Sequence, residues 1–206
     1  VDSANYKWSD GTETATKTIE FEITKATTNA ITGLAIEGWT FGESAKTPSA
    51  SATFGTPAFT YVGTGETNYA ENATPPANAG TYKVIAKVAD TTNYEGASDE
   101  KTFTIAKATP TYTAPVNLKA TYGDTLADVT LPDGWSWKDA ETSVGNAGEQ
   151  TFAAIFTPSD TNNYSTVEEN ITITVAKKEV AEPVASGSYT YTGNEQTVTL
   201  TGVESF

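Results

Sequence analysis

The sequence contains no cysteine, no histidine and no arginine among its 206 residues. Without cysteine, neither a disulfide framework nor a thiolate metal site can form. The lack of histidine removes the commonest general base and the commonest transition-metal ligand. Without arginine, no guanidinium can clamp a phosphate or a carboxylate in a bidentate manner. We therefore expect no resident metal and no cofactor.

Positive charge is also scarce, since 12 lysines face 26 acidic residues and the formal net charge is -14. Phosphate binding requires cationic neutralisation, so we expect no nucleic-acid partner and no attraction to an anionic membrane surface. No stretch approaches the ~20 consecutive apolar residues of a membrane span, and we expect no membrane insertion. The N-terminus lacks a signal-peptide pattern. Because the chain begins inside a repeat, we interpret it as an excerpt of a longer protein.

Threonine and other strand-favouring residues are frequent, and apolar side chains alternate with polar ones along several short segments. In residues 170–175, for example, Ile171, Ile173 and Val175 are expected on one face of a strand. Similar alternation occurs in four further segments: residues 17–25, 81–90, 101–107 and 149–158. No segment has a sustained 3.6-residue apolar period, so we expect an all-β chain with little helix.

Three sequence landmarks recur in the same order along the chain. The first is an aromatic residue, Gly and an acid, found at 41–43 and 122–124 and, in a looser form with an extra Thr192, at 191–194. The second is Asn-Ala-Gly, at 78–80 and 146–148. The third is Asp-x-x-Asn-Tyr, at 2–6, 90–94 and 160–164, which leads into a strand ending in Lys25, Lys107 or Lys177.

These landmarks predict two whole repeats, at 26–107 and 108–177. Residues 1–25 are interpreted as the closing strands of a preceding repeat, and residues 178–206 as the opening strands of a following one. Short strands between polar turns favour small antiparallel, Ig-like β-sandwiches. The junctions are short and contain no Gly/Ser run, so we expect tandem modules arranged as an elongated rod.

On these landmarks the chain resembles the MBG repeats of bacterial surface proteins, of the YGX type. The resemblance rests on residues 122–124 and 41–43, on the Asn-Ala-Gly-Thr-Tyr run at 78–82 and on the Asn-Tyr hairpins. Phe41 departs from the usual Tyr. The resemblance implies long extracellular proteins of Gram-positive bacteria that act as adhesins or stalks, often attached to the cell wall. It implies no catalytic residues.

Two features are candidates for ligand binding. Trp135 and Trp137 lie on one face of a predicted strand, where paired indoles suit sugar rings. The aromatic pair Phe59 and Tyr61 stands at the same place in the first repeat, which favours packing within the module instead. Residues 63–77 are an extra polar segment of the first repeat that holds Tyr69. This segment is either a binding loop or a tolerated insertion with little core, whose deletion should leave the fold intact.

The Asp-x-x-Asn-Tyr element has two interpretations: a Ca²⁺ loop, or a turn whose Tyr anchors the hairpin in the core. The turn is favoured, because the acids and the bidentate Glu of an EF-hand loop are absent. No carboxylate pair stands in a distinctive constellation, so we expect no enzyme activity. An intramolecular isopeptide bond between a Lys and an Asn side chain is a further possibility. The acid motif that flanks such bonds in pilus-type modules is not evident in the sequence.

Together these observations predict a non-catalytic segment of a cell-surface protein, acting as a stalk or adhesive shaft. Its partners would be neighbouring repeats and a host glycan, mucin or protein receptor. The rival interpretation is an array of carbohydrate-binding modules that contacts glycans directly through Trp135, Trp137 or Tyr69.

Overall fold

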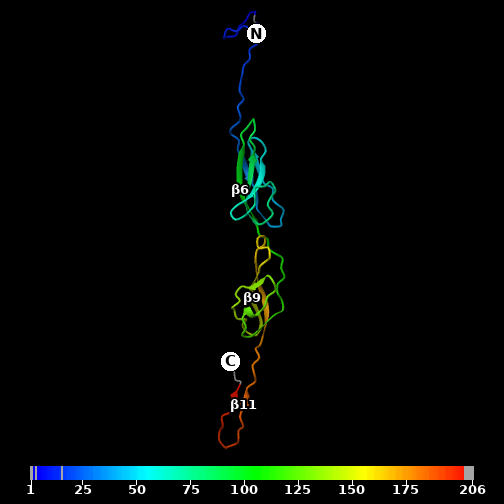
Figure 1. Ribbon diagram of the computed structural model, residues 1–206, viewed down its shortest axis with the longest axis vertical. Helices are drawn as coiled ribbons and strands as arrows, with labels where there is room; N and C mark the ends of the chain where they lie inside the picture. The colour runs from blue at the N-terminus through cyan, green and yellow to red at the C-terminus, as the bar shows by residue number, and fades with distance from the viewer. Residues whose placement is uncertain (1, 3, 15, 202–206) are drawn as a thin grey trace. The chain divides into compact units, whose positions relative to one another are not determined.

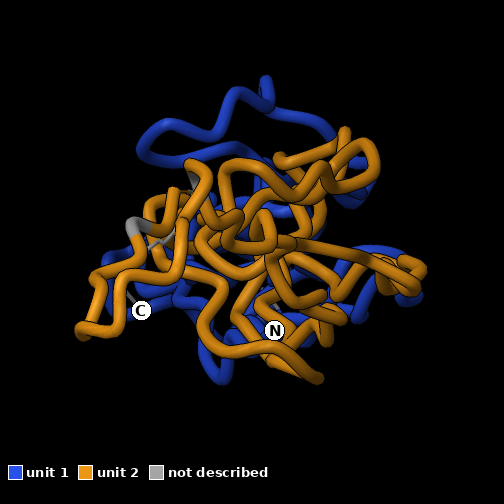
Figure 2. The backbone as a smooth tube through the Cα atoms, turned by 90° about the horizontal axis from the view of Figure 1, so that it is seen from below, with its two compact units in different colours: residues 1–106 blue, residues 107–206 orange. Residues whose placement is uncertain are grey.

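The computed structural model describes residues 2, 4–14 and 16–201, and the remaining positions of the two end segments, 1, 3, 15 and 202–206, lie outside the described residues. The described chain is all-β, and its only helical element is one 3-10 turn. Consequently no described helix is long and apolar enough to cross a membrane. The chain divides into two compact units, residues 1–106 and 107–206, which are coloured separately in Figure 2.

Unit 1 holds a four-stranded sheet and a smaller two-stranded sheet (Figure 1). The four-stranded sheet has the order β2-β6-β5-β4, and the two-stranded sheet pairs β1 with β3. The strands are β1 (Ile31–Ala35), β2 (Trp39–Thr40), β3 (Ser49–Ala52), β4 (Ala58–Gly63), β5 (Gly80–Val88) and β6 (Ala97–Ala106). All pairs are antiparallel except β2 with β6, which run parallel.

The core of unit 1 lies on the face of the sheet that the alternating residues predict. Tyr82, Val84, Ala86 and Val88 of β5 are all buried, and so are Phe103 and Ile105 of β6. Trp39 stacks on Phe103 with ring centroids 5.2 Å apart. The sequence-based prediction for these two strands is therefore confirmed. The sheets pack in a sandwich-like arrangement around this aromatic core.

Unit 2 holds a four-stranded sheet of the order β7-β10-β9-β8. Its strands are β7 (Leu118–Thr121), β8 (Trp135–Trp137), β9 (Gly148–Phe156) and β10 (Val167–Ala176), and the 3-10 turn η1 spans Leu126–Asp128. On β10 the buried residues are Ile171, Ile173 and Val175, as the alternation predicts. Leu126 of η1 and the loop residues Val129 and Val144 complete this core, so irregular segments here replace the small sheet of unit 1.

The two four-stranded sheets share the register of three of their strands but not of the fourth. Trp39 lies beside Ile105 in unit 1, and Ala120 lies at the corresponding point beside Val175 in unit 2. Tyr61 on β4 pairs with Val84, whereas Trp137 on β8 is shifted by two residues and pairs with Ala154, the counterpart of Ala86. A shift by two residues keeps the same face toward the core, whereas a slip by one residue would expose every core side chain.

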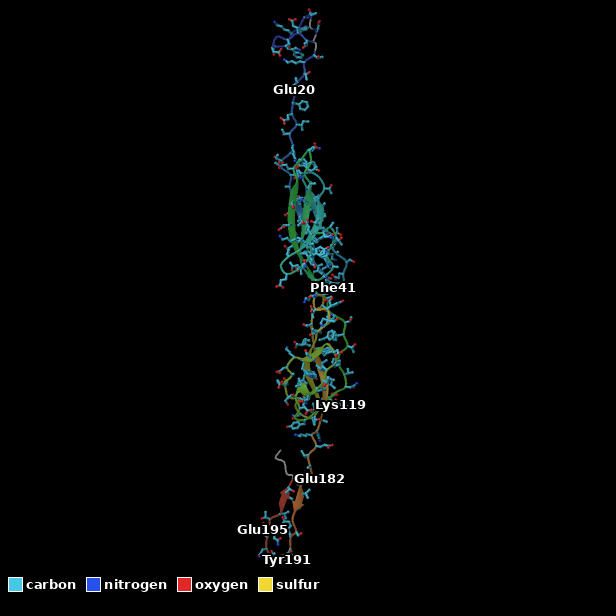
Figure 3. All side chains as sticks on the ribbon, in the orientation of Figure 1. Glu20, Phe41, Lys119, Glu182, Tyr191 and Glu195 are labelled. Atoms are coloured by element: carbon cyan, nitrogen blue, oxygen red, sulfur yellow. The ribbon has the colours of Figure 1, made fainter. Side chains whose placement is uncertain are left out.

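The end segments depart from the alternation-based prediction. The described residues between 16 and 25 form no strand, and Ile19, Phe21 and Ile23 are more than 80 % exposed (82, 82 and 85 %). Near the other end, β11 (Val184–Ser186) pairs with β12 (Thr199–Thr201) in a hairpin. Tyr191, on the loop of this hairpin, is 93 % exposed (Figure 3). An isolated pair of strands buries too little apolar surface to form a core.

Candidate functional site

Trp137 is packed into unit 2. Its indole Nε1 donates a hydrogen bond to the backbone oxygen of Val129 over 2.9 Å, and its ring meets Phe152 edge-on at 6.3 Å. The side chain belongs to the rim of the hydrophobic core. The hydrogen bond and the ring contact hold this half-buried indole within the unit, so the geometry favours the packing interpretation for Trp137.

Trp135 lies on the same face of β8 but belongs to a separate aromatic cluster. Its ring contacts Phe156 and Tyr112, and the three ring centroids lie 5.4–5.6 Å apart. Tyr112 is 37 % exposed, and Trp135 and Phe156 are half-buried. The cluster therefore presents aromatic surface to solvent at one end of the sheet.

Glu169 of β10 adds a carboxylate to this aromatic cluster. A hydrogen bond with the Glu169 side chain raises the pKa of Tyr112, and partial desolvation and the carboxylate charge act in the same direction. The carboxylate oxygen Oε2 of Glu169 is buried and has no hydrogen-bond partner among the described residues. A buried carboxylate oxygen normally has a partner, so this oxygen is an acceptor that the described contacts leave unused.

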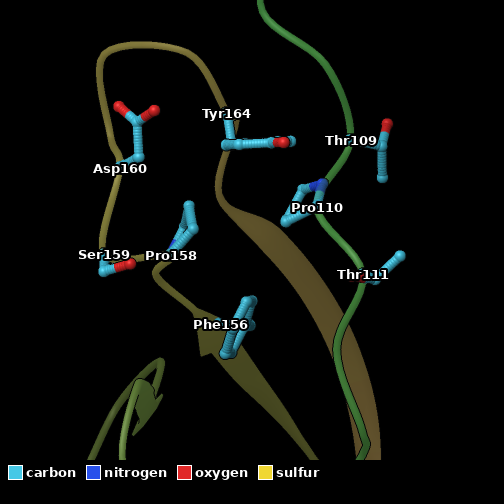
Figure 4. A pocket seen from close by; sticks show the side chains of 8 residues that line it. All are labelled: Thr109, Pro110, Thr111, Phe156, Pro158, Ser159, Asp160 and Tyr164. Atoms are coloured by element: carbon cyan, nitrogen blue, oxygen red, sulfur yellow. The ribbon is translucent and has the colours of Figure 1, made fainter. Parts of the chain in front are cut away.

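A hollow of about 440 Å³ borders the cluster and shares Phe156 with it. In Figure 4, Tyr164 extends toward Pro110, and Pro158 and Asp160 lie on the same loop as Tyr164, facing the segment that holds Pro110. The Asp160 carboxylate is already engaged: Oδ1 accepts from the backbone amide of Asn163 and Oδ2 from its side-chain amide. The hollow thus offers apolar and aromatic surface. Its one acid, Asp160, is already hydrogen-bonded within its own turn.

Tyr69 and its loop are part of the structure of unit 1. The Tyr69 ring packs edge-on against Tyr82 at 5.9 Å, and its hydroxyl donates to the backbone oxygen of Thr74. Pro76 is fully buried, and Tyr61 exchanges two backbone hydrogen bonds with Asn72. The expectation of a tolerated insertion with little core is therefore wrong, because the segment pairs with β4 and fills the core edge.

The Asp-x-x-Asn-Tyr loops are turns that hold a distant part of the backbone. In unit 2 the amide of Ala108 donates to Asn163, and Ser165 donates back to Ala108, both over 2.9 Å. In unit 1 Ala26 exchanges the corresponding bonds with Asn93 and Glu95. Each loop therefore forms two backbone hydrogen bonds with the residue that follows a closing lysine. We call this pair of bonds the clasp. The described residues include no group of three or more acidic side chains able to hold a metal ion.

The tyrosine of this loop lies outside the main core, contrary to expectation. Tyr164 is half-buried and lines the hollow, while Tyr94 stacks on Phe54 with centroids 5.9 Å apart. Sequence alone could not separate a core position from a position at the end of the sandwich, because both bury part of an aromatic ring.

The aromatic-Gly-acid landmark is a second turn that both units share. In unit 2 Gly123 has φ +99°, and the Asp124 carboxylate accepts from the amide of Thr121 over 2.7 Å. In unit 1 Gly42 has φ +88°, and Glu43 accepts from Thr40 in the same way. The landmark is thus explained by turn geometry and not by a ligand.

No protein-family model matches the chain, and no curated protein matches its sequence.

Proposed function

We propose that the chain is a non-catalytic segment of a bacterial cell-surface protein of the MBG, YGX-type repeat kind, in which successive units form a stalk or adhesive shaft outside the cell. The observation that carries the proposal is the repeated clasp. Ala26 follows the closing Lys25, Ala108 follows the closing Lys107, and each is bound by the Asp-x-x-Asn-Tyr loop of its own unit. The same pair of backbone bonds in successive units is typical of a repeat protein, in which each unit is joined to the next in the same way.

The clasp supports a stiff array because it leaves almost no free chain at the junction. Strand β6 ends at Ala106, and Ala108 is already hydrogen-bonded within unit 2. In addition, the Lys107 ammonium donates to the backbone oxygen of Thr161 over 2.6 Å. Repeat proteins with such short connections transmit orientation from one unit to the next, which is what a stalk requires.

Small-angle X-ray scattering of the whole chain tests this proposal. A compact chain of this length has a radius of gyration of about 17 Å, whereas units placed in line give more than about 25 Å. We expect the larger value together with a scattering profile of a folded, stiff particle. A value near 17 Å would refute the stalk.

A second function, direct glycan binding, is favoured by one observation. Trp135, Tyr112 and Phe156 form a partly exposed aromatic cluster beside the hollow at Tyr164. Aromatic faces pack on the C–H faces of sugars, and the Glu169 carboxylate at the cluster accepts hydrogen bonds of the kind that hydroxyls donate.

Titration with mucin glycans and plant polysaccharides, followed by Trp fluorescence and calorimetry, tests glycan binding. The binding variant is Trp135→Ala, and the matched control is Trp39→Phe, which alters a buried indole of unit 1. Saturable binding of one glycan class that Trp135→Ala abolishes and Trp39→Phe retains would support a glycan-binding module. Absence of binding by the unaltered chain would leave the shaft role alone.

A further inference from the structure

The segment that enters each unit runs parallel to the strand that closes it. In unit 2, β7 pairs with β10 in parallel from Leu118, opposite Ile173, to Thr121, opposite Ala176. The pairing continues through a 2.9 Å hydrogen bond from the amide of Tyr122 to Ala176. Upstream, the parallel bridge between Ala108 and Tyr164 attaches the same segment near the start of β10.

Unit 1 repeats this arrangement with different side chains. A parallel bridge joins Ala26 to Tyr94 before β6 begins, and β2 pairs in parallel with β6 at its end. The amide of Phe41 donates to the oxygen of Ala106 over 2.8 Å, as Tyr122 does to Ala176 in unit 2. Both units therefore hold the entering segment at two points, one near each end of the closing strand.

The direction of these pairs decides how the unit responds to tension. The chain enters beside the start of the closing strand and leaves from the end of that strand. Tension on the two ends therefore pulls the entering segment backward and the closing strand forward, along one shared axis. The backbone hydrogen bonds between them cross this axis, so they are loaded together in shear. An adjacent pair pulled apart from one end would instead lose its bonds one at a time.

Close packing and side-chain contacts reinforce the attachment points. A Cβ atom on Gly38 would lie 2.4 Å from the backbone oxygen of Thr104, so only glycine allows β2 to approach β6 this closely. At the upstream point the ammonium of Lys25 is paired with Asp90, and that of Lys107 donates to Thr161. These contacts hold the segments in register while the backbone bonds carry the load.

We propose that each unit is a force-bearing module whose parallel pairing between entering segment and closing strand forms a mechanical clamp. The proposal rests on the stalk function, since only a protein stretched between two attachment points experiences this load. Each backbone bond contributes only ~1 kcal/mol at equilibrium. Bonds that must break simultaneously nevertheless raise the barrier to unfolding, and forced unfolding is governed by the unfolding rate. The clamp thus gives a module of modest stability a high resistance to pulling.

Single-molecule force spectroscopy of the whole chain tests the clamp directly, because the absence of cysteine allows handles at chosen positions. Handles at Ala106→Cys, an exposed position that leaves Lys107 in place, and at Lys177→Cys load the clamp of unit 2 in shear. Handles at Thr121→Cys and Lys177→Cys load the same β7–β10 bonds from one end. We expect an unfolding force at least about twofold higher in the shear geometry, because the bonds then break together.

A second variant identifies the upstream attachment point. Ala108→Pro removes the amide that donates to Asn163, and in the shear geometry it should lower the unfolding force of unit 2. With handles at the ends of the chain, unit 1 serves as the unaltered control. Equal forces in the two pulling directions would overturn the clamp, whatever scattering shows about the shape of the stalk. A compact particle in scattering with a strong directional force would instead refute the stalk and retain the clamp.

Discussion

Gly42 and Gly123 occupy the same place in the turn that follows β2 and β7, with φ +88° and +99°. A side chain at either position meets no atom within 4 Å, so space does not select glycine there. The left-handed backbone conformation selects glycine, because the Cβ atom of any other residue in this conformation would lie too close to the following carbonyl oxygen. The glycine of the repeated landmark is therefore required by conformation alone.

Replacing Gly123 by Ala should destabilise unit 2 by about 1–2 kcal/mol, since the strain of a left-handed residue is the only penalty. Urea unfolding measures the loss. Gly123→Asn is the matched control and should cost less, because Asn tolerates this conformation better. A Gly123→Ala variant as stable as the unaltered chain would show that the turn can adopt another conformation.

Asp90 provides a test by pH. The hydrogen bond from Lys25 lowers the pKa of Asp90 below its ordinary value of 3.8, although partial desolvation opposes this effect. Because the folded pKa lies below the unfolded one, the carboxylate stabilises the fold above the unfolded value. This contribution is lost as the pH falls through the folded pKa.

We therefore expect Asp90→Asn to lower the stability of unit 1 at neutral pH, with a difference that closes below pH 3.8. Denaturant unfolding of both proteins across this pH range measures it. High salt should shrink the neutral-pH effect, because both side chains are partly exposed. Lys25→Gln should reproduce the loss, and a difference that persists in acid would assign the role of Asp90 to its backbone turn instead.

Strands were the elements most predictable from sequence. The alternation in β5, β6 and β10 identifies the buried side chains correctly, because one face of each strand must pack against a core. Residues 17–25 carry the same alternation, yet the described residues there form no strand. Apolar–polar alternation predicts which face a strand would bury. The strand itself forms only where a neighbouring strand supplies partners for its backbone hydrogen bonds.

The parallel pairing and the clasp were not predictable. Ala26 and Ala108 are unremarkable residues, and the bonds that hold them use only backbone atoms. Of the candidate site residues, Trp135 and Trp137 share a strand face as expected, but nothing in the sequence separates the exposed cluster from the packed indole. That difference depends on Tyr112 and Val129, which contact the two indoles from loops outside β8.

The loop at 64–77 gives a test at the level of a whole element. Deleting it should destabilise unit 1 by at least about 3 kcal/mol, because it removes the Tyr69 ring from the core edge together with the buried Pro76. Denaturant unfolding with Trp135 and Trp137 replaced by Phe, so that no tryptophan of unit 2 contributes, reports on unit 1 through Trp39 fluorescence. Tyr69→Phe keeps the ring and loses only the bond to Thr74, so it should cost about 1 kcal/mol. An unchanged midpoint after deletion would restore the interpretation of this loop as a simple insertion.

At the scale of the whole molecule, the two units share three local features. Each unit repeats the same parallel register between its entering and closing strands, the same glycine turn and the same pair of backbone bonds to the residue after a closing lysine. The proposed stalk requires the chain to keep one direction as it passes from β6 into unit 2, and the backbone bonds of Ala108 are the feature proposed to impose it. Stiffness at this junction is what distinguishes a stalk from two tethered domains.

The most direct test is the distance between spin labels at Thr102→Cys and Thr172→Cys, exposed and equivalent positions on β6 and β10. Six residues separate Thr102 from Ala108, and seven separate Ser165, which is bonded to Ala108, from Thr172. If the extended chain continues in line at about 3.3 Å per residue, the two labelled positions should lie roughly 43 Å apart. Pulsed electron–electron double resonance should give a single narrow distribution of label-to-label distances near this value. The Ala108→Pro variant should give a broader distribution. A broad distribution in the unaltered chain, or a narrow one far shorter than this, would contradict the stiff stalk.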